Sequence, residues 1–295
     1  MPSAQISDTI RLEYETFGSP ADPTVLLVMG FTAQMIAWDE DFCRAIADRG
    51  RHVVRFDNRD CGLSTRLDGV SVDTAAVLAA GLDPSLEMPE VPYLLSDMAA
   101  DAIGLLDHLK VDSAHLIGAS MGGMIVQQAV IDHPERVASV TSVMSTTGNP
   151  EVGRPTPEAM EALLAPPPEG REEYIDAAQR WSIWASKRYF DLDRAREQAA
   201  ASYDRAFYPE GASRQMAAIL ASGDRSAALA TSAVPMLVIH GLDDTLIAPS
   251  GGEHTAECVP GSTLLMLADM GHDMPPALWP TIVDAIIDHQ QSAVG

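Results

Sequence analysis

The stretch Gly118-Ala119-Ser120-Met121-Gly122-Gly123 decides how the rest of the chain is interpreted. The apolar run 114–119 leads into it as a strand would, and 124–130 leads out as a helix would. A strand that turns directly into a helix leaves little room, and the glycines on both sides of Ser120 supply it. The turn also places Ser120 at a helix N-terminus, where the helix dipole favours negative charge. A glycine-rich turn with a capping serine is the alternative interpretation of these residues.

Short apolar runs alternate with amphipathic stretches along most of the chain, which is typical of an α/β protein with a mostly parallel sheet. We expect an edge strand over 10–14 and buried strands over 24–29, 52–58, 114–119, 137–144, 235–240 and 263–267. The clearest helices are expected over 96–109, with Ser96 as the N-cap, and over 278–290. The alternation stops between about 149 and 230, where the sequence is helical and charged. We therefore expect 149–230 to be a helical insertion into a core formed by 1–148 and 231–295.

Composition excludes several classes of protein. The chain has 295 residues with 19 basic and 42 acidic side chains, which gives a net charge of −23. Such a surface repels phosphate backbones and anionic lipids, so we expect no nucleic-acid partner and no membrane anchor. The N-terminus carries no visible secretory signal, and the longest apolar run, 25–31, is too short for a membrane span. We expect a soluble, cytoplasmic protein, and the sequence leaves a monomer and a homodimer equally open.

Cofactor-binding patterns do not occur in the sequence. The 3 cysteines are widely spaced, so they predict neither a disulfide framework nor a structural zinc site. Phosphate loops and dinucleotide fingerprints are also missing. We expect no cofactor and no metal ion.

A base for Ser120 is the next requirement, because a serine hydroxyl is a poor nucleophile until its proton is accepted. Of the 8 histidines, His272 lies in Asp269-Met270-Gly271-His272-Asp273, on a loop just after the last expected strand. That is the place of the base when the chain order is serine, acid, histidine. The other histidines lie within expected strands or on expected helices. The pattern therefore predicts His272 as the base.

The acid that orients His272 is expected after the preceding strand. That strand runs into Gly241-Leu242-Asp243-Asp244-Thr245, which offers two adjacent carboxylates. We choose Asp244, because its place in the loop before two aliphatic residues and Pro249 turns it toward the histidine. Asp243 is interpreted as a carboxylate that caps the turn.

Two backbone N–H groups are expected to stabilise negative charge beside Ser120. One belongs to Met121, the residue after the serine. The other is expected in Val28-Met29-Gly30-Phe31-Thr32, the loop after the first buried strand. Gly30 lets the backbone come close, and Phe31 is the predicted second donor. Each such donor is typically worth about 3 kcal/mol of an activation barrier.

These motifs resemble the α/β-hydrolase superfamily in their order and over nearly the whole chain. The sequence is most similar to actinobacterial esterases and lipases of the aclacinomycin-methylesterase-like group, including mycobacterial lipase-type members. The resemblance implies the α/β-hydrolase fold, with a mostly parallel, doubly wound sheet of eight strands and an inserted helical cap. The segment Asp57–Ser64 departs from the family pattern, since Asp60 stands where glycine is usual. We interpret this segment as a structural turn over the sheet edge, with a role for Asp60 and Cys61 at the rim of the active site as the alternative.

The activity implied by this resemblance is hydrolysis of carboxylic esters by a serine carboxylesterase. In it, Ser120 attacks, His272 moves the proton, Asp244 orients His272, and the N–H groups of Phe31 and Met121 form an oxyanion hole. The net charge and an apolar pocket favour neutral, medium-sized esters with short to medium acyl or aryl groups. Thioesterase, lactonase or cofactor-free perhydrolase activity on the same residues is the alternative. A ligand-binding homologue without catalysis is the alternative from a different class.

Overall fold

The computed structural model describes residues 2–83 and 85–293, which contain a sheet of eight strands in the order β1-β2-β4-β3-β5-β6-β7-β8. Their bounds are β1 (Ser3–Gln5), β2 (Arg11–Phe17), β3 (Thr24–Val28), β4 (His52–Phe56), β5 (Ala114–Ala119), β6 (Val137–Val143), β7 (Met236–Gly241) and β8 (Thr263–Leu267). β2 pairs antiparallel with both β1 and β4. All other neighbouring strands are parallel, as an α/β-hydrolase fold requires.

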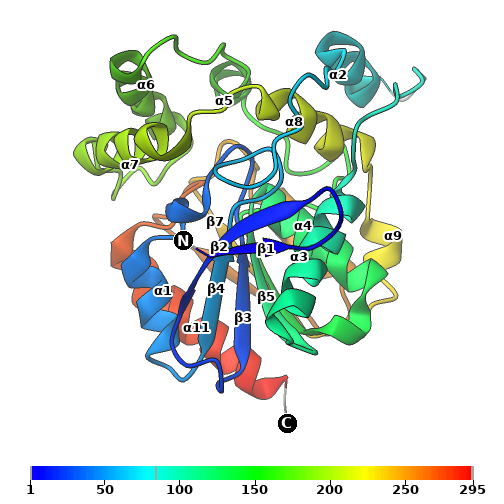
Figure 1. The fold of residues 1–295 in the computed structure, drawn as a ribbon, viewed down its shortest axis with the longest axis vertical. Coiled ribbons are helices and arrows are strands. Elements are labelled where there is room, and N and C mark those ends of the chain that lie inside the picture. The colour runs from blue at the N-terminus through cyan, green and yellow to red at the C-terminus, as the bar shows by residue number, and fades with distance from the viewer. Residues whose placement is uncertain (1, 84, 294–295) are drawn as a thin grey trace.

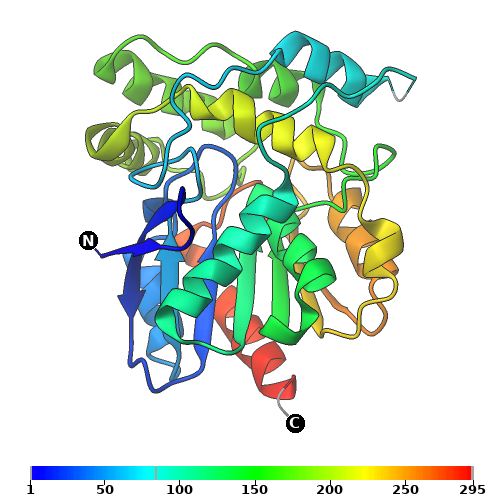
Figure 2. The same cartoon turned by 45° about the vertical axis from the view of Figure 1, so that its right-hand side comes forward.

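Helices cover both faces of this sheet (Figure 1, Figure 2). One face packs against α1 (Glu40–Ala47) and α11 (Trp279–Ser292), and the other against α3 (Leu95–Leu109), α4 (Met121–Asp132) and α10 (Ser250–Cys258). Alternate residues of β3 therefore join different cores: Val25 and Leu27 pack with α1 and α11, whereas Leu26 and Val28 pack with α3 and α4. A strand buried on both faces needs an unbroken apolar sequence, which explains the pattern of β3.

Several local predictions differ from the structure. The strand over 10–14 was expected at the edge of the sheet, but β2 lies between β1 and β4. β1 has only three residues and was not expected, because so short a strand shows no alternation that stands out from its surroundings. Ser96 is not an N-cap, since α3 begins at Leu95 and the N–H of Leu94 donates to the Asp97 carboxylate at 2.8 Å. β8 is not a buried strand, because it is the last strand of the sheet and its first two residues are exposed.

A layer of helices lies over the carboxyl ends of the parallel strands, at the top of Figure 1. It consists of α5 (Pro157–Leu163), α6 (Arg171–Ala177), a 3₁₀ helix (Ala178–Ile183), α7 (Leu192–Ala206) and α8 (Gly211–Ala221). α2 (Thr74–Leu82), from outside the 149–230 interval, packs against α8. α9 (Ser226–Leu229), from inside the interval, packs against α4 and α10 instead. Shorter 3₁₀ helices lie at Met35–Ala37, Pro134–Arg136 and Pro276–Leu278.

None of the helices in residues 2–83 and 85–293 combines the length and the apolar character that a bilayer crossing requires.

Candidate active site

Ser120 lies at the turn between β5 and α4, in a strained backbone conformation with φ 56° and ψ −120°. The three glycines around it are required because other parts of the chain come too close for a side chain. A Cβ atom on Gly118 would lie 2.1 Å from the Gly122 carbonyl oxygen, and one on Gly122 would lie 2.0 Å from the Val28 carbonyl oxygen. On Gly123 it would lie 2.4 Å from the Ser145 Cβ. The turn thus holds the Ser120 side chain at the carboxyl end of the sheet.

The structure brings Ser120, His272 and Asp244 together from three separate loops. His272 Nε2 lies 2.9 Å from Ser120 Oγ, and His272 Nδ1 lies 2.7 Å from Asp244 Oδ2. An ionised carboxylate can only accept hydrogen bonds, so the Nδ1–H donates to Asp244 and leaves Nε2 free to accept the serine proton. The side chains of His272 and Asp244 are only 8% and 0% exposed, which strengthens these contacts by excluding water.

Asp244 is held as a charged, fully hydrogen-bonded group. Its Oδ1 accepts the N–H groups of Leu246 and Ile247, both at 2.9 Å. The buried His240 lies with its Nε2 3.5 Å from Oδ2. Burial alone would raise the pKa of Asp244, but the charge of His272 and the hydrogen bonds from His240 and His272 outweigh it and lower that pKa to about 2.

The neighbouring carboxylate, Asp243, is bound to Lys187 and not to His272. Its Oδ1 lies 3.1 Å from Lys187 Nζ, and it makes no contact with the histidine ring in the described part of the chain. Of the two adjacent carboxylates, the structure therefore puts Asp244 against the imidazole.

The loop that carries His272 is attached to the segment 184–186 of the helical layer. The N–H of His272 donates to the Trp184 carbonyl oxygen at 2.6 Å, and Asp273 Oδ1 accepts the N–H of Ser186 at 2.8 Å. A Cβ on Gly271 would lie 2.3 Å from the Trp184 oxygen, so only glycine permits this approach. These contacts could not be predicted, since two backbone segments that meet over a long sequence separation leave no pattern of side chains.

The two predicted amide donors belong to backbone segments that lie next to Ser120. Met121 is the first residue of α4, and its N–H has no partner within the helix. Gly30 precedes Phe31 in the loop after β3, and a Cβ on Gly30 would lie 3.0 Å from the Ser120 Cβ. The backbone of this loop therefore runs beside the serine. Asn58 Nδ2 donates to the Met29 carbonyl oxygen at 2.8 Å and fixes the start of the loop.

Comparison with known proteins agrees with the fold. The family described as "alpha/beta hydrolase fold" matches residues 23–275. The chain belongs to the α/β-hydrolase family. This α/β hydrolase is 29% identical to rhodomycin D methylesterase from Streptomyces peucetius over 99% of both chains. It is 25% identical to 3-oxoadipate enol-lactonase 2 from Acinetobacter baylyi over 90% of both chains. Its fold is similar to that of a meta-cleavage product hydrolase from Pseudomonas fluorescens IP01, with a TM-score of 0.77, 18% identity and coverage of 99% and 98% of the two chains.

The segment 57–64 of the hydrolase connects the core to the helical layer, which its sequence did not predict. Asp60, at φ 60°, forms a two-bond ion pair with Arg214 of α8, with both distances 2.8 Å and both side chains buried. Asp57 forms a second ion pair with Arg205 of α7, at 2.8 Å. The segment is thus more than a turn over the sheet edge. The one sequence signal was Asp60 itself, which stands where the family usually has glycine.

Breaking the Asp60–Arg214 pair is expected to destabilise the hydrolase strongly. Arg214→Met leaves a buried charge on Asp60 without its partner, which typically costs about 3–5 kcal/mol. Adding Asp60→Asn removes that charge, and asparagine tolerates the left-handed backbone, so the double variant should recover about half of the loss. Urea unfolding of the three proteins measures this. Equal stability of Arg214→Met and the wild type would contradict the role given to the pair.

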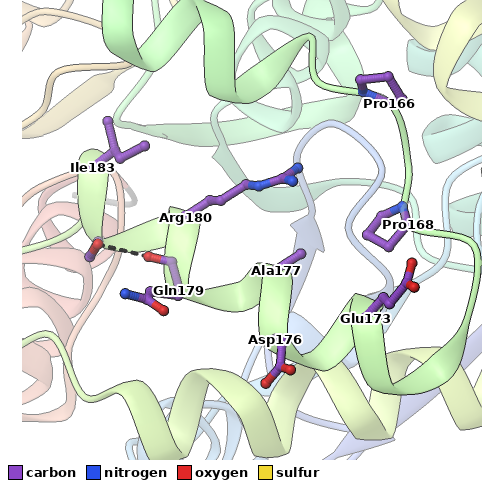
Figure 3. A pocket seen from close by; sticks show the side chains of 9 residues that line it. Pro166, Pro168, Glu173, Asp176, Ala177, Gln179, Arg180 and Ile183 are labelled. Carbon is purple, nitrogen blue, oxygen red and sulfur yellow. Dashed lines mark hydrogen bonds between the residues drawn. The ribbon is translucent and has the colours of Figure 1, made fainter.

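The helical layer also contains a hollow of about 640 Å³, shown in Figure 3. Arg180 extends along it, between Pro166 and Pro168 on one side and Ile183 on the other. Glu173 and Asp176 complete its charged lining, and the lining includes none of Ser120, Asp244 and His272.

In the described residues, no group of three or more His, Cys, Asp or Glu side chains is arranged to hold a metal ion.

Proposed function

We propose that this α/β hydrolase cleaves carboxylic esters through an acyl-enzyme formed on Ser120. The observation that carries the proposal is the continuous contact from Ser120 Oγ through the His272 ring to Asp244, with distances of 2.9 and 2.7 Å. Full-length similarity to a methylesterase supports it. The same contacts favour catalysis over a ligand-binding homologue, because a serine within hydrogen-bond distance of an oriented base is the arrangement that activates a nucleophile.

In the first half of the reaction, Ser120 Oγ attacks the ester carbonyl carbon while His272 Nε2 accepts the hydroxyl proton. The carbonyl oxygen becomes an oxyanion, which accepts hydrogen bonds from the N–H groups of Phe31 and Met121. Collapse of this intermediate breaks the bond to the alcohol oxygen, and His272 donates its proton to that oxygen. The alcohol leaves, and the acyl group remains on Ser120.

In the second half, a water molecule takes the place of the alcohol. His272 accepts a proton from the water as its oxygen attacks the acyl carbon. The second oxyanion is stabilised by the same two N–H groups, and its collapse returns the proton to Ser120 Oγ. The carboxylic acid leaves, and Asp244 keeps the Nδ1 proton of His272 in place throughout.

The preferred substrates in this proposal are neutral esters with short to medium acyl or aryl groups. The net charge of −23 supports this preference, since it lowers the local concentration of anionic substrates. The proposal also takes 149–230 as a cap over the site. The proposal includes a cytoplasmic location, which cell fractionation tests. It leaves a homodimer as the alternative to a monomer, and light scattering distinguishes the two.

Lactone hydrolysis is the second candidate, and the similarity to an enol-lactonase favours it. The chemistry is the same, except that the alcohol remains tied to the acyl group after the first step.

A comparison of substrates tests the proposed function. Initial rates are measured on p-nitrophenyl esters from acetate to octanoate, on acyl-CoA thioesters with the same acyl groups, and on a six-membered lactone. We expect kcat/KM to be highest for a neutral oxygen ester with a short or medium acyl group. Faster hydrolysis of the matching thioester, or of the lactone, would overturn the ester assignment in favour of that substrate.

A further inference from the structure

The turn after β3, which carries the Phe31 amide, is held in place by side chains from distant segments. Asn58 Nδ2 donates to the Met29 carbonyl oxygen, and Gln215 Oε1 accepts the N–H of Thr32 at 2.8 Å. The thiol of Cys61 donates to the Thr32 carbonyl oxygen at 3.4 Å. Both the N–H and the carbonyl oxygen of Thr32 are therefore hydrogen-bonded to side chains from distant segments.

Thr32 has a backbone conformation that it would not adopt by itself. Its φ of 58° is in the left-handed region, where a β-branched residue is strained by about 1–3 kcal/mol. Its side chain is exposed, so packing of that side chain does not hold the conformation. Two kinds of hydrogen bond hold it instead: a long one that closes the turn, from the Ala33 N–H to the Gly30 carbonyl oxygen at 3.3 Å, and those made by the backbone of Thr32 itself. The shortest of these runs from the Thr32 N–H to Gln215, at 2.8 Å.

Gln215 is a rigid acceptor for this N–H. Its side chain belongs to α8 and is fully buried, and its Nε2 donates to the Arg59 carbonyl oxygen at 2.9 Å. With the amide group bound at both ends, it cannot rotate away from Thr32. The adjacent Arg214–Asp60 ion pair anchors the same turn of α8.

We infer that Gln215 is a positioning residue for the oxyanion hole, so that the helical layer itself shapes the site on the core. This inference rests on the proposed function. The Phe31 amide directly precedes the strained Thr32 in the turn. If the bond to Gln215 is lost, Thr32 relaxes from the left-handed region, and the turn carries the Phe31 N–H away from the oxyanion position.

Gln215→Met tests this inference, because methionine has nearly the same shape and neither accepts from Thr32 nor donates to Arg59. We expect kcat on a p-nitrophenyl ester to fall about 100-fold, the loss typical for one oxyanion donor, with KM changed less than about threefold. The inhibition constant of a trifluoromethyl ketone, which binds as an oxyanion on Ser120, should rise in parallel with the loss of kcat.

Ser222→Ala is the matched control. Ser222 Oγ, near the other end of α8, accepts the N–H of Leu95 at 2.9 Å, so the variant also breaks a bond from this helix to the core. It leaves the turn after β3 intact, and we expect kcat and the inhibition constant to stay at wild-type values. An equal loss in Ser222→Ala would mean that general loosening of α8, and not the turn, is responsible, and would overturn the inference.

A second substitution separates positioning from stability. Glycine adopts a positive φ without strain, so adding Thr32→Gly to Gln215→Met should restore at least about tenfold of the lost kcat. A role of Gln215 in stability alone would not respond to the residue at position 32.

If Gln215→Met does not fold, Gln215→Glu replaces it. When protonated, the new carboxyl group can accept a hydrogen bond from the Thr32 N–H and donate one to the Arg59 carbonyl oxygen. The kcat of the variant, relative to that of the wild type, should therefore be near normal at low pH. The ratio should fall as the pH rises, because the ionised carboxylate faces the Arg59 oxygen. A ratio that does not change with pH would contradict the inference.

The outcomes distinguish this inference from the proposed function. An active wild type whose kcat survives Gln215→Met overturns only the role of Gln215. A wild type that hydrolyses no ester, or whose activity persists in Ser120→Ala, overturns the proposed function.

Discussion

Replacing Ser120 with alanine is expected to lower kcat for ester hydrolysis by about 10⁶-fold, because no other group can form the acyl-enzyme. The residual rate comes from the N–H groups that still bind the oxyanion when water attacks directly. The Ser120 side chain makes one hydrogen bond, to His272, so the melting temperature should change little. Rates on p-nitrophenyl butyrate and a thermal melt measure the two effects.

Ser182→Ala is the control for Ser120→Ala. Ser182 is an exposed serine of the helical layer, and its Oγ donates to the Gln179 carbonyl oxygen. Activity should be unchanged in this variant. More than about 1% of wild-type activity in Ser120→Ala, in a preparation free of contaminating esterase, would mean that Ser120 is not the nucleophile.

Asp244→Asn should have the second-largest effect, a loss of about 10⁴-fold in kcat. An asparagine can turn its NH₂ group toward His272, which then keeps its proton on Nε2 and cannot accept the one from Ser120. Asp243→Asn is the matched control, since this adjacent carboxylate contacts Lys187 and not His272. Equal losses in the two variants, measured at the same pH, would contradict the assignment of the acid.

The contribution of Asp244 to the stability of the folded protein should depend on pH, and the lowered pKa determines the direction. Its pKa in the folded protein is lowered from 3.8 to about 2, so the folded state binds its proton less readily than the unfolded chain does. The stabilising contribution is therefore complete above about pH 4 and is lost as the pH falls through 2. The difference in unfolding free energy between the wild type and Asp244→Asn should shrink over that range. A difference that grows on acidification would contradict the lowered pKa.

Local patterns predicted the parts of the fold that local physics determines. The turn at Ser120 could be found because the glycines it requires lie within three residues of it. β3 and its parallel neighbours could be found because strands buried on both faces must be continuously apolar. His272 and Asp244 follow strands in an order shared across the family, and the structure brings both to Ser120.

Contacts over long separations could not be predicted in the same way. Gln215 bonds to Thr32, and Arg214 to Asp60, over more than 150 residues, and neither α8 residue belongs to a motif. The burial of β8 was predicted wrongly, because an apolar strand does not reveal whether a neighbour lies on its other side. The start of α3 was also predicted wrongly, since Asp97 caps it from inside the first turn and Ser96 does not.

The most direct test of the central claim is to trap the acyl-enzyme. The hydrolase is mixed with excess p-nitrophenyl acetate, quenched in acid within milliseconds, digested and analysed by mass spectrometry. We predict one added acetyl group on the peptide that contains Ser120, and none in Ser120→Ala treated in the same way. Release of p-nitrophenol by the wild type at full rate, with no acetyl group on Ser120 at any quench time and no burst of product, would contradict the account.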